Sequence, residues 1–201
     1  MSELLLEMRT FAAQQGVPVL RTEAERLLRL LMERYQPLRI LEIGTAIGYS
    51  ALLMAKLVPD CRILTLEKDE ERIRDAQRFW RREPGVVERI CLWQGDATEG
   101  LSTLNETFDF VFIDAAKGHY LSYLQQVLPH LRSGSIILAD DVLFYGQVYG
   151  PCPRRMRTIA KRMRQYLEFV QNTEQFQTTL YSEGDGLAVS IYQGVKNNEI
   201  T

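Results

Sequence analysis

The stretch that decides the fold is Arg39-Ile40-Leu41-Glu42-Ile43-Gly44-Thr45-Ala46-Ile47-Gly48-Tyr49-Ser50. The aliphatic residues before Gly44 form a short apolar run, which predicts a buried parallel strand. Gly44 and Gly48 bracket a tight turn, and helix-forming residues follow over 50–56. A strand, a glycine loop and a helix start are typical of the nucleotide-binding crevice of a doubly wound α/β sheet.

The glycine spacing of this loop and the acids near it narrow the class of ligand that the loop could bind. Its glycine spacing is G-x-x-x-G, which differs from the G-x-G-x-x-G of dinucleotide-binding folds. Glu42 places a carboxylate beside the loop, where the ammonium group of a ligand could sit. The next strand, predicted over 61–66, ends in Glu67, and an acid at that tip is suited to grip a ribose diol. We therefore interpret Glu67 as a ribose ligand rather than as the acidic start of a helix.

The rest of the chain alternates helices and strands. Helices are predicted over 2–15, 69–82 and 118–131, and another begins at Thr22, where Thr22 and Glu25 form a capping-box pattern. Strands are predicted over 40–43, 61–66, 89–93, 108–114, 135–139, 175–181 and 187–192, the last two joined by a tight hairpin. We expect a Rossmann-like, doubly wound α/β fold: a seven-stranded, mostly parallel sheet with helices on both faces and an antiparallel last strand. The whole chain, 1–201, would be one domain, with an N-terminal helical cap at 1–36 and a core at 37–201.

Composition indicates an ordinary globular protein, with 201 residues, 46% of them hydrophobic and 25% charged. The net charge of −2 excludes a strongly basic nucleic-acid coat, although not a local basic patch. Cys61, Cys91 and Cys152 fit neither a zinc spacing nor a disulfide framework, which favours a reducing compartment. The N-terminus carries acids where a signal peptide carries bases, and no apolar run has membrane-spanning length. We therefore expect a cytoplasmic protein without membrane association.

Acids follow two neighbouring strands at the ends where an α/β sheet binds ligands. Asp114 ends the strand at 108–114, and Asp140 and Asp141 follow the strand at 135–139. Three carboxylates converging at one edge would repel one another. A hard divalent cation with oxygen ligands would relieve that repulsion, so the sequence predicts a metal site here.

A basic segment follows a loop near the C-terminal end. Residues 153–166 contain no acid, and none occurs before Glu168. Arg154 and Arg155 are candidate phosphate contacts, although a solvated helix face would carry the same charges. The preceding loop, 142–152, is a candidate lid, and Tyr145 and Tyr149 are candidates for the substrate mouth.

Four motifs, taken together, resemble those of a known family. They are Leu41-Glu42-Ile43-Gly44-Thr45-Ala46-Ile47-Gly48-Tyr49-Ser50, Phe112-Ile113-Asp114-Ala115-Ala116-Lys117-Gly118-His119-Tyr120, Ala139-Asp140-Asp141-Val142-Leu143 and Gly184-Asp185-Gly186-Leu187. With them, the chain from about Val17 to Tyr192 resembles the cation-dependent class I O-methyltransferases, which use S-adenosylmethionine (SAM). This family contains catechol and caffeoyl-coenzyme A O-methyltransferases, and its bacterial branch includes the tRNA 5-hydroxyuridine methyltransferase.

The resemblance implies roles for the matching residues. Asp114, Asp140 and Asp141 would hold Mg²⁺, or another divalent cation such as Mn²⁺, and Lys117 would act with Asp114 beside the reacting hydroxyl. SAM would be bound by Glu42, Gly44, Gly48, Tyr49, Ser50, Glu67, Asp96, Ala97 and Asp114. The third metal ligand of the family is usually Asn, so Asp141 adds a negative charge.

Three functions are consistent with the sequence. The first is O-methylation of 5-hydroxyuridine in tRNA, with Arg154, Arg155 and Tyr145 as substrate-binding residues. The second is the same reaction on a small catechol-like phenol, since catechol and 5-hydroxyuridine both offer two adjacent oxygens. The third, a nicotinamide-dependent oxidoreductase or a non-catalytic nucleotide-binding module, is disfavoured by the missing G-x-G-x-x-G and by the clustered acids. Homodimers are common in the family, so a homodimer is the expected assembly.

Overall fold

The computed structural model describes residues 2–172 and 174–194, and the chain divides into two compact units, Met1–Leu104 and Asn105–Thr201. The arrangement of the chain as a single domain stays a prediction.

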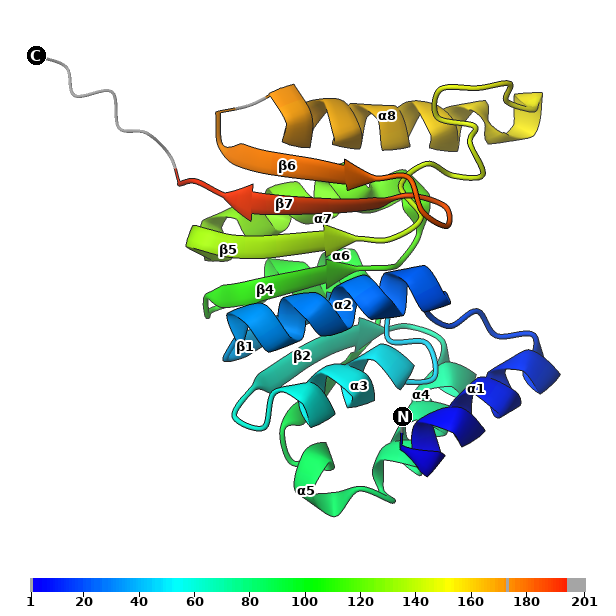
Figure 1. Ribbon diagram of the computed structural model, residues 1–201, viewed down its shortest axis with the longest axis vertical. Coiled ribbons are helices and arrows are strands. Elements are labelled where there is room, and N and C mark those ends of the chain that lie inside the picture. The colour runs from blue at the N-terminus through cyan, green and yellow to red at the C-terminus, as the bar shows by residue number, and fades with distance from the viewer. Residues whose placement is uncertain (1, 173, 195–201) are drawn as a thin grey trace, which may run out of the picture. The chain divides into compact units, whose positions relative to one another are not determined.

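The first unit contains three parallel strands and six helices among its described residues (Figure 1). Its strands are β1 (Arg39–Ile43), β2 (Arg62–Glu67) and β3 (Ile90–Gln94), with β2 paired in parallel to both neighbours. Its helices are α1 (Glu3–Gln15), α2 (Thr22–Tyr35), α3 (Tyr49–Leu57), α4 (Glu70–Trp80), α5 (Pro84–Val87) and α6 (Ala97–Ser102). The aliphatic residues of β1 are fully buried, which confirms the predicted buried strand.

The second unit carries the remaining strands and a long C-terminal helix. Its strands are β4 (Phe108–Ile113), β5 (Leu131–Ala139), β6 (Phe176–Tyr181) and β7 (Leu187–Tyr192). Its helices are η1 (Lys117–His119), α7 (Tyr120–Val127), η2 (Leu128–His130), η3 (Arg154–Met156) and α8 (Arg157–Asn172). β4 and β5 are parallel, whereas β7 runs antiparallel to both β5 and β6. The predicted antiparallel last strand is therefore confirmed.

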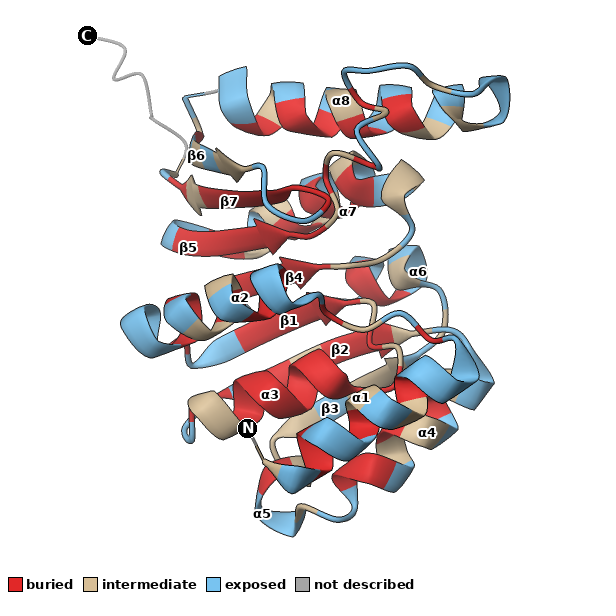
Figure 2. Ribbon diagram, turned by 45° about the vertical axis from the view of Figure 1, so that its right-hand side comes forward, coloured by how far each residue is buried: buried red, intermediate tan, exposed pale blue. Residues whose placement is uncertain are grey.

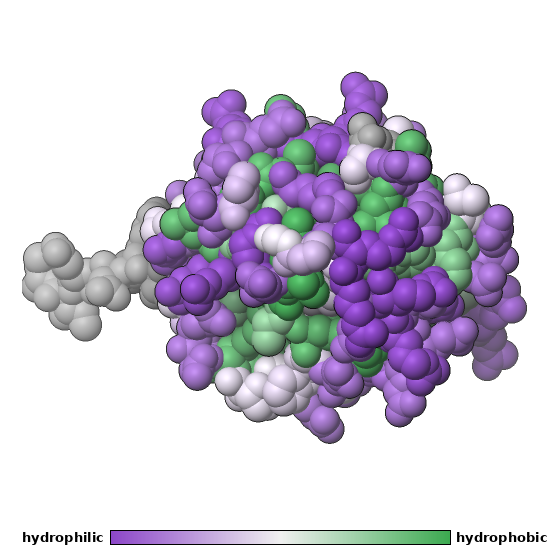
Figure 3. Space-filling model, turned by 90° about the horizontal axis from the view of Figure 1, so that it is seen from below, coloured by the Kyte–Doolittle hydropathy of each residue, from purple (hydrophilic) through white to green (hydrophobic). Residues whose placement is uncertain are grey.

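Burial separates the two sides of the outer helices. Figure 2 shows α8 buried along the side that packs and exposed along the other, while β5 and β7 are mostly buried. Figure 3 shows a face on which hydrophilic side chains predominate and hydrophobic ones lie in patches between them. No helix in the described part of the chain has the length and apolar character needed to cross a membrane.

Two local predictions are wrong. The capping box does not form: the N-cap of α2 is Arg21, without a side-chain cap bond, because Glu25 is engaged elsewhere. The helix predicted over 118–131 is shorter, since α7 ends at Val127 and β5 begins at Leu131 rather than at 135. Phe108 pairs with Leu131 and Phe110 with Ile136, so the turn-like residues 132–135 form an irregularity inside the strand.

Candidate functional site

In the first unit, the glycine loop joins β1 to α3 and is held by backbone bonds. The N–H groups of Gly44 and Thr45 both donate to the carbonyl of Leu66, at 3.1 and 3.2 Å. Gly44 and Gly48 have φ values of 102° and 78°, in the region that favours glycine. These contacts fix the loop at the carboxyl ends of β1 and β2, where α/β folds bind nucleotides.

Glu67 connects this loop to the tip of β2. One of its carboxylate oxygens accepts from the N–H of Ala46 at 2.9 Å, and the other accepts from the N–H groups of Lys68 and Asp69. The carboxylate is thus oriented by three backbone donors beside the glycine loop. That placement suits the predicted ribose role, which stays a prediction.

Glu42 lies beneath the loop and is fully buried. Its two carboxylate oxygens accept hydrogen bonds from Ser50 and Thr65, and Thr65 in turn bonds to Thr45 at 2.6 Å. Glu42 and Ser50 therefore brace the start of α3 against the sheet. Thr65 belongs to this network, but sequence reasoning missed it because a threonine inside a strand carries no distinguishing signal.

Tyr49 points toward the N-terminal helices. Its hydroxyl donates to Glu25 of α2 at 2.7 Å and accepts from Arg9 of α1 at 2.9 Å. Burial, reinforced by the bond to Glu25, raises the pKa of Tyr49 to about 12. Burial also opposes ionisation of Glu25, but hydrogen bonds from Arg9, Tyr49 and Arg29 outweigh it and hold the pKa of Glu25 below its ordinary value. The cluster ties both N-terminal helices to the first residue of α3.

Trp80 is a further contact of the loop that the sequence did not predict. Its indole N–H donates to the carbonyl of Gly48 at 2.9 Å, and its side chain is almost fully buried. A Cβ at position 48 would lie 2.5 Å from the indole ring.

Asp96, in the neighbouring loop, caps α6 by accepting from the N–H of Thr98, with Ala97 next to it.

In the second unit, Lys117 lies among the predicted metal-binding acids. Its Nζ is 3.2 Å from a carboxylate oxygen of Asp114 and 3.1 Å from one of Asp141. Burial alone would lower the pKa of Lys117, but Tyr120, Asp114 and Asp141 outweigh burial and raise it. Lys117 is therefore the cation that balances two of these acids.

Asp140 completes this cluster and is nearly buried, at 5% exposure. Burial, together with the nearby charges of Asp114 and Asp141, raises the pKa of Asp140 to about 7. Asp114 and Asp141 thus both contact Lys117, and their negative charges act on Asp140. As a donor set, three carboxylates suit Mg²⁺. In the described residues, however, no group of three or more His, Cys, Asp or Glu side chains is arranged to hold a metal ion.

Tyr120 is hydrogen-bonded to Lys117 through its hydroxyl group. Its buried hydroxyl accepts from Lys117 Nζ at 3.3 Å and donates to the backbone carbonyl of Asp140 at 3.0 Å. The residue thereby links the lysine to the end of β5. The three-residue spacing from Lys117 to Tyr120 was visible in the sequence, but their contact depends on the 3₁₀ turn of η1.

The predicted lid, residues 142–152, is braced by the turn between β6 and β7. The N–H groups of Val142 and Leu143 donate to the carbonyls of Gly186 and Asp185, at 3.0 and 2.8 Å. Tyr145 and Tyr149, which the loop carries, are 69% and 62% exposed. They lie outward on a loop whose first residues are held in place.

Comparisons with known proteins identify the family. Residues 1–192 match the O-methyltransferase family. The chain belongs to this family. A catechol O-methyltransferase from Niastella koreensis is 35% identical over 153 residues, covering 73% of this chain and 69% of the relative.

Solved structures agree with this assignment. A putative caffeoyl-CoA O-methyltransferase from Staphylococcus aureus has a TM-score of 0.88 at 28% identity. The match covers 96% of this chain and 93% of the Staphylococcus aureus chain. The O-methyltransferase TomG from Streptomyces achromogenes, solved in complex with SAM, has a TM-score of 0.86 at 27% identity, with 96% and 91% covered. The expected seven-stranded, mostly parallel fold is confirmed, as is the SAM-dependent O-methyltransferase class at the level of the family.

Proposed function

We propose that this O-methyltransferase transfers the methyl group of SAM to the 5-hydroxyl of 5-hydroxyuridine in tRNA, with the help of a divalent cation. Methyl transfer from a sulfonium is an in-line displacement, so alignment of donor and acceptor supplies much of the acceleration. SAM would be held by the glycine loop, Glu67 and Asp96. The acceptor hydroxyl would bind at Lys117.

The cation requirement rests on the chemistry of the three carboxylates as oxygen donors rather than on their observed arrangement. Asp114, Asp140 and Asp141 would hold Mg²⁺ or Mn²⁺, which when bound would lower the pKa of the acceptor hydroxyl. Lys117, hydrogen-bonded to the hydroxyl of Tyr120, would stabilise the negative charge on the acceptor oxygen after the hydroxyl proton has passed to solvent water. Asp114 would keep the lysine ammonium directed at that oxygen.

The observation that carries the choice of tRNA is a basic face without acidic partners. Arg154 and Arg155 of η3 and Arg157, the first residue of α8, are exposed, and none of them forms an ion pair within the described residues. We call these three residues the basic face.

Three arginines of α4 and of the residues directly after it provide the contrast. Arg74, Arg78 and Arg82 are paired with Glu70, Asp75 and Glu7. Unneutralised arginines favour phosphate binding, and exposed aromatic rings such as those of Tyr145 and Tyr149 favour stacking on bases.

A charge reversal tests this choice. The variant Arg154→Glu/Arg155→Glu should raise KM for tRNA by about tenfold or more and flatten its salt dependence, because phosphate contacts are lost. Turnover of a small catechol should change little. Arg74→Glu/Arg81→Glu reverses the same amount of charge on α4 and its C-cap residue and should leave tRNA methylation intact. Equal losses in both double variants, or none in either, would reject the basic face as the tRNA contact.

A small catechol-like phenol is the second candidate acceptor, favoured by the catechol O-methyltransferase relative. Saturable turnover of a simple catechol at low concentration, with no label entering tRNA, would support it. The cytoplasmic location and the homodimer also stay proposals.

A further inference from the structure

A hollow in the second unit adjoins the turn that carries Lys117. It has a volume of about 340 Å³ and lies where η1 and the start of α7 meet α8. Its lining includes Gly118, His119, Ser122, Gln125, Arg162 and Gln165. Gly118 and His119 belong to the same 3₁₀ turn, η1, as the candidate catalytic lysine, Lys117, so the hollow and that lysine share one short element.

The lining of this hollow favours an anion. It contains no carboxylate, and Arg162 is its one residue with a permanent charge. Within the described residues Arg162 pairs with no acid; its one hydrogen bond is a long contact of 3.4 Å to the carbonyl of Gly118. The guanidinium therefore keeps most of its five donors available, and its planar fork matches the oxygens of a phosphate.

Neutral donors surround this charge. Ser122, Gln125 and Gln165 supply hydroxyl and amide groups, and the His119 ring is stacked on Tyr123 with ring centroids 5.7 Å apart. The stacking restrains the imidazole at the rim. The combination of one unpaired arginine with several neutral donors is suited to a phosphate group.

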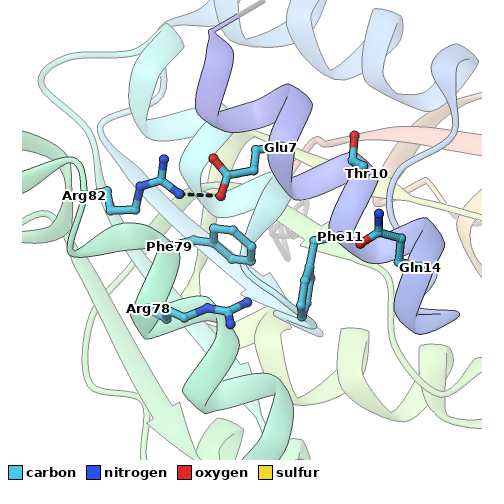
Figure 4. A pocket seen from close by; sticks show the side chains of 7 residues that line it. All are labelled: Glu7, Thr10, Phe11, Gln14, Arg78, Phe79 and Arg82. Carbon is cyan, nitrogen blue, oxygen red and sulfur yellow. Dashed lines mark hydrogen bonds and ion pairs between the residues drawn. The ribbon is translucent and has the colours of Figure 1, made fainter.

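A hollow in the first unit shows the opposite chemistry. It has a volume of about 420 Å³ and lies between α1 and α4 (Figure 4). Arg82 is paired with Glu7 there, and Arg78 lies over the rings of Phe11 and Phe79, at 4.6 and 4.8 Å from their centroids. Its arginines are already partnered, so an unpaired cation distinguishes the hollow at Arg162.

We propose that the hollow at Arg162 is a phosphate subsite of the acceptor site. It would bind the phosphate attached to the nucleoside whose hydroxyl lies at Lys117. This inference rests on the proposed function and deepens it: the enzyme would recognise a nucleotide rather than a free nucleoside or phenol, through Arg162.

Paired acceptors test the subsite. Methyl transfer is measured with 5-hydroxyuridine and with its 5′-monophosphate, which differ only in the phosphate. The wild-type enzyme should prefer the monophosphate by about tenfold in kcat/KM, as expected for a charge-assisted contact at an exposed site. Arg162→Ala should abolish the preference without changing turnover of the nucleoside. Lys161→Ala, which removes the same charge one residue outside the lining, should retain the preference.

The alternative outcomes separate this inference from the function on which it rests. Equal use of both acceptors by the wild type, or a preference that survives in Arg162→Ala, would overturn the subsite but leave tRNA methylation standing. If neither acceptor is methylated, the proposed function fails for these substrates, and NMR titration with the monophosphate decides the subsite. Shifts of the Gly118 and Ser122 amides that vanish in Arg162→Ala would support it, and their absence in the wild type would overturn it.

Discussion

Replacing Gly48 by alanine tests how tightly the glycine loop is fitted against α4. The left-handed backbone of residue 48, with φ of 78°, costs an alanine about 1–2 kcal/mol. The new Cβ would also lie 2.5 Å from three atoms of the buried Trp80 indole. Forcing that ring aside costs about 1–3 kcal/mol, as overpacking in a core does. The expected loss of unfolding free energy is therefore about 2–5 kcal/mol.

Gly16 supplies the matched control for this prediction. Its φ of 63° is similar, but no heavy atom lies within 4 Å of a Cβ built there. Gly16→Ala should therefore cost only the backbone share, about 1–2 kcal/mol. Urea unfolding followed by circular dichroism measures both variants. A Gly48→Ala loss no larger than that of Gly16→Ala would refute the contact between Trp80 and the loop.

Three further predictions concern single side chains. Tyr120→Phe should lower kcat by about tenfold because Lys117 loses a hydrogen-bond partner, whereas KM for SAM should hold; unchanged kcat in initial-rate assays would contradict this. Glu25→Gln should destabilise the protein at pH 7, because the fold stabilises the ionised form of Glu25. The loss of stability should shrink as the pH falls through the lowered folded-state pKa of Glu25. A loss that does not depend on pH in urea unfolding would argue against the contacts of Glu25 with Arg9 and Tyr49. Asp140→Asn should stabilise the chelator-treated protein at pH 8. The pKa of Asp140 is raised in the folded state, so the stability of the wild type falls as the pH rises from about 4 to the folded-state pKa near 7. A lower Tm in the variant than in the wild type would contradict this prediction.

The sequence predicted the features that depend on local pattern. The apolar run before Gly44 and the acids after β4 and β5 follow from strand burial and strand ends, and both appear in the structure. The capping box failed for a long-range reason: Glu25 bonds to Arg9 and Tyr49, which lie 16 and 24 residues away in the chain. Contacts between residues so far apart in the chain leave no periodic pattern in the sequence.

The strand β5 shows a second limit of pattern reasoning. Arg132, Ser133 and Gly134 have the composition of a turn, and the prediction therefore began the strand after them. In the structure they belong to the strand itself, where the pairing with β4 shifts register and Gly134 has a φ of 92°. Similarly, the indole of Trp80 reaches Gly48 across 32 residues, and only the packing of α4 shows it.

The most direct test of the account is transfer of labelled methyl from SAM to tRNA that carries unmethylated 5-hydroxyuridine, with a catechol assayed in parallel. Each acceptor is incubated with Mg²⁺ or with a chelator. We predict label in tRNA that the chelator abolishes, at acceptor concentrations far below those required for catechol. Label confined to catechol would contradict the tRNA assignment, and label in tRNA that resists the chelator would contradict the role of Asp114, Asp140 and Asp141.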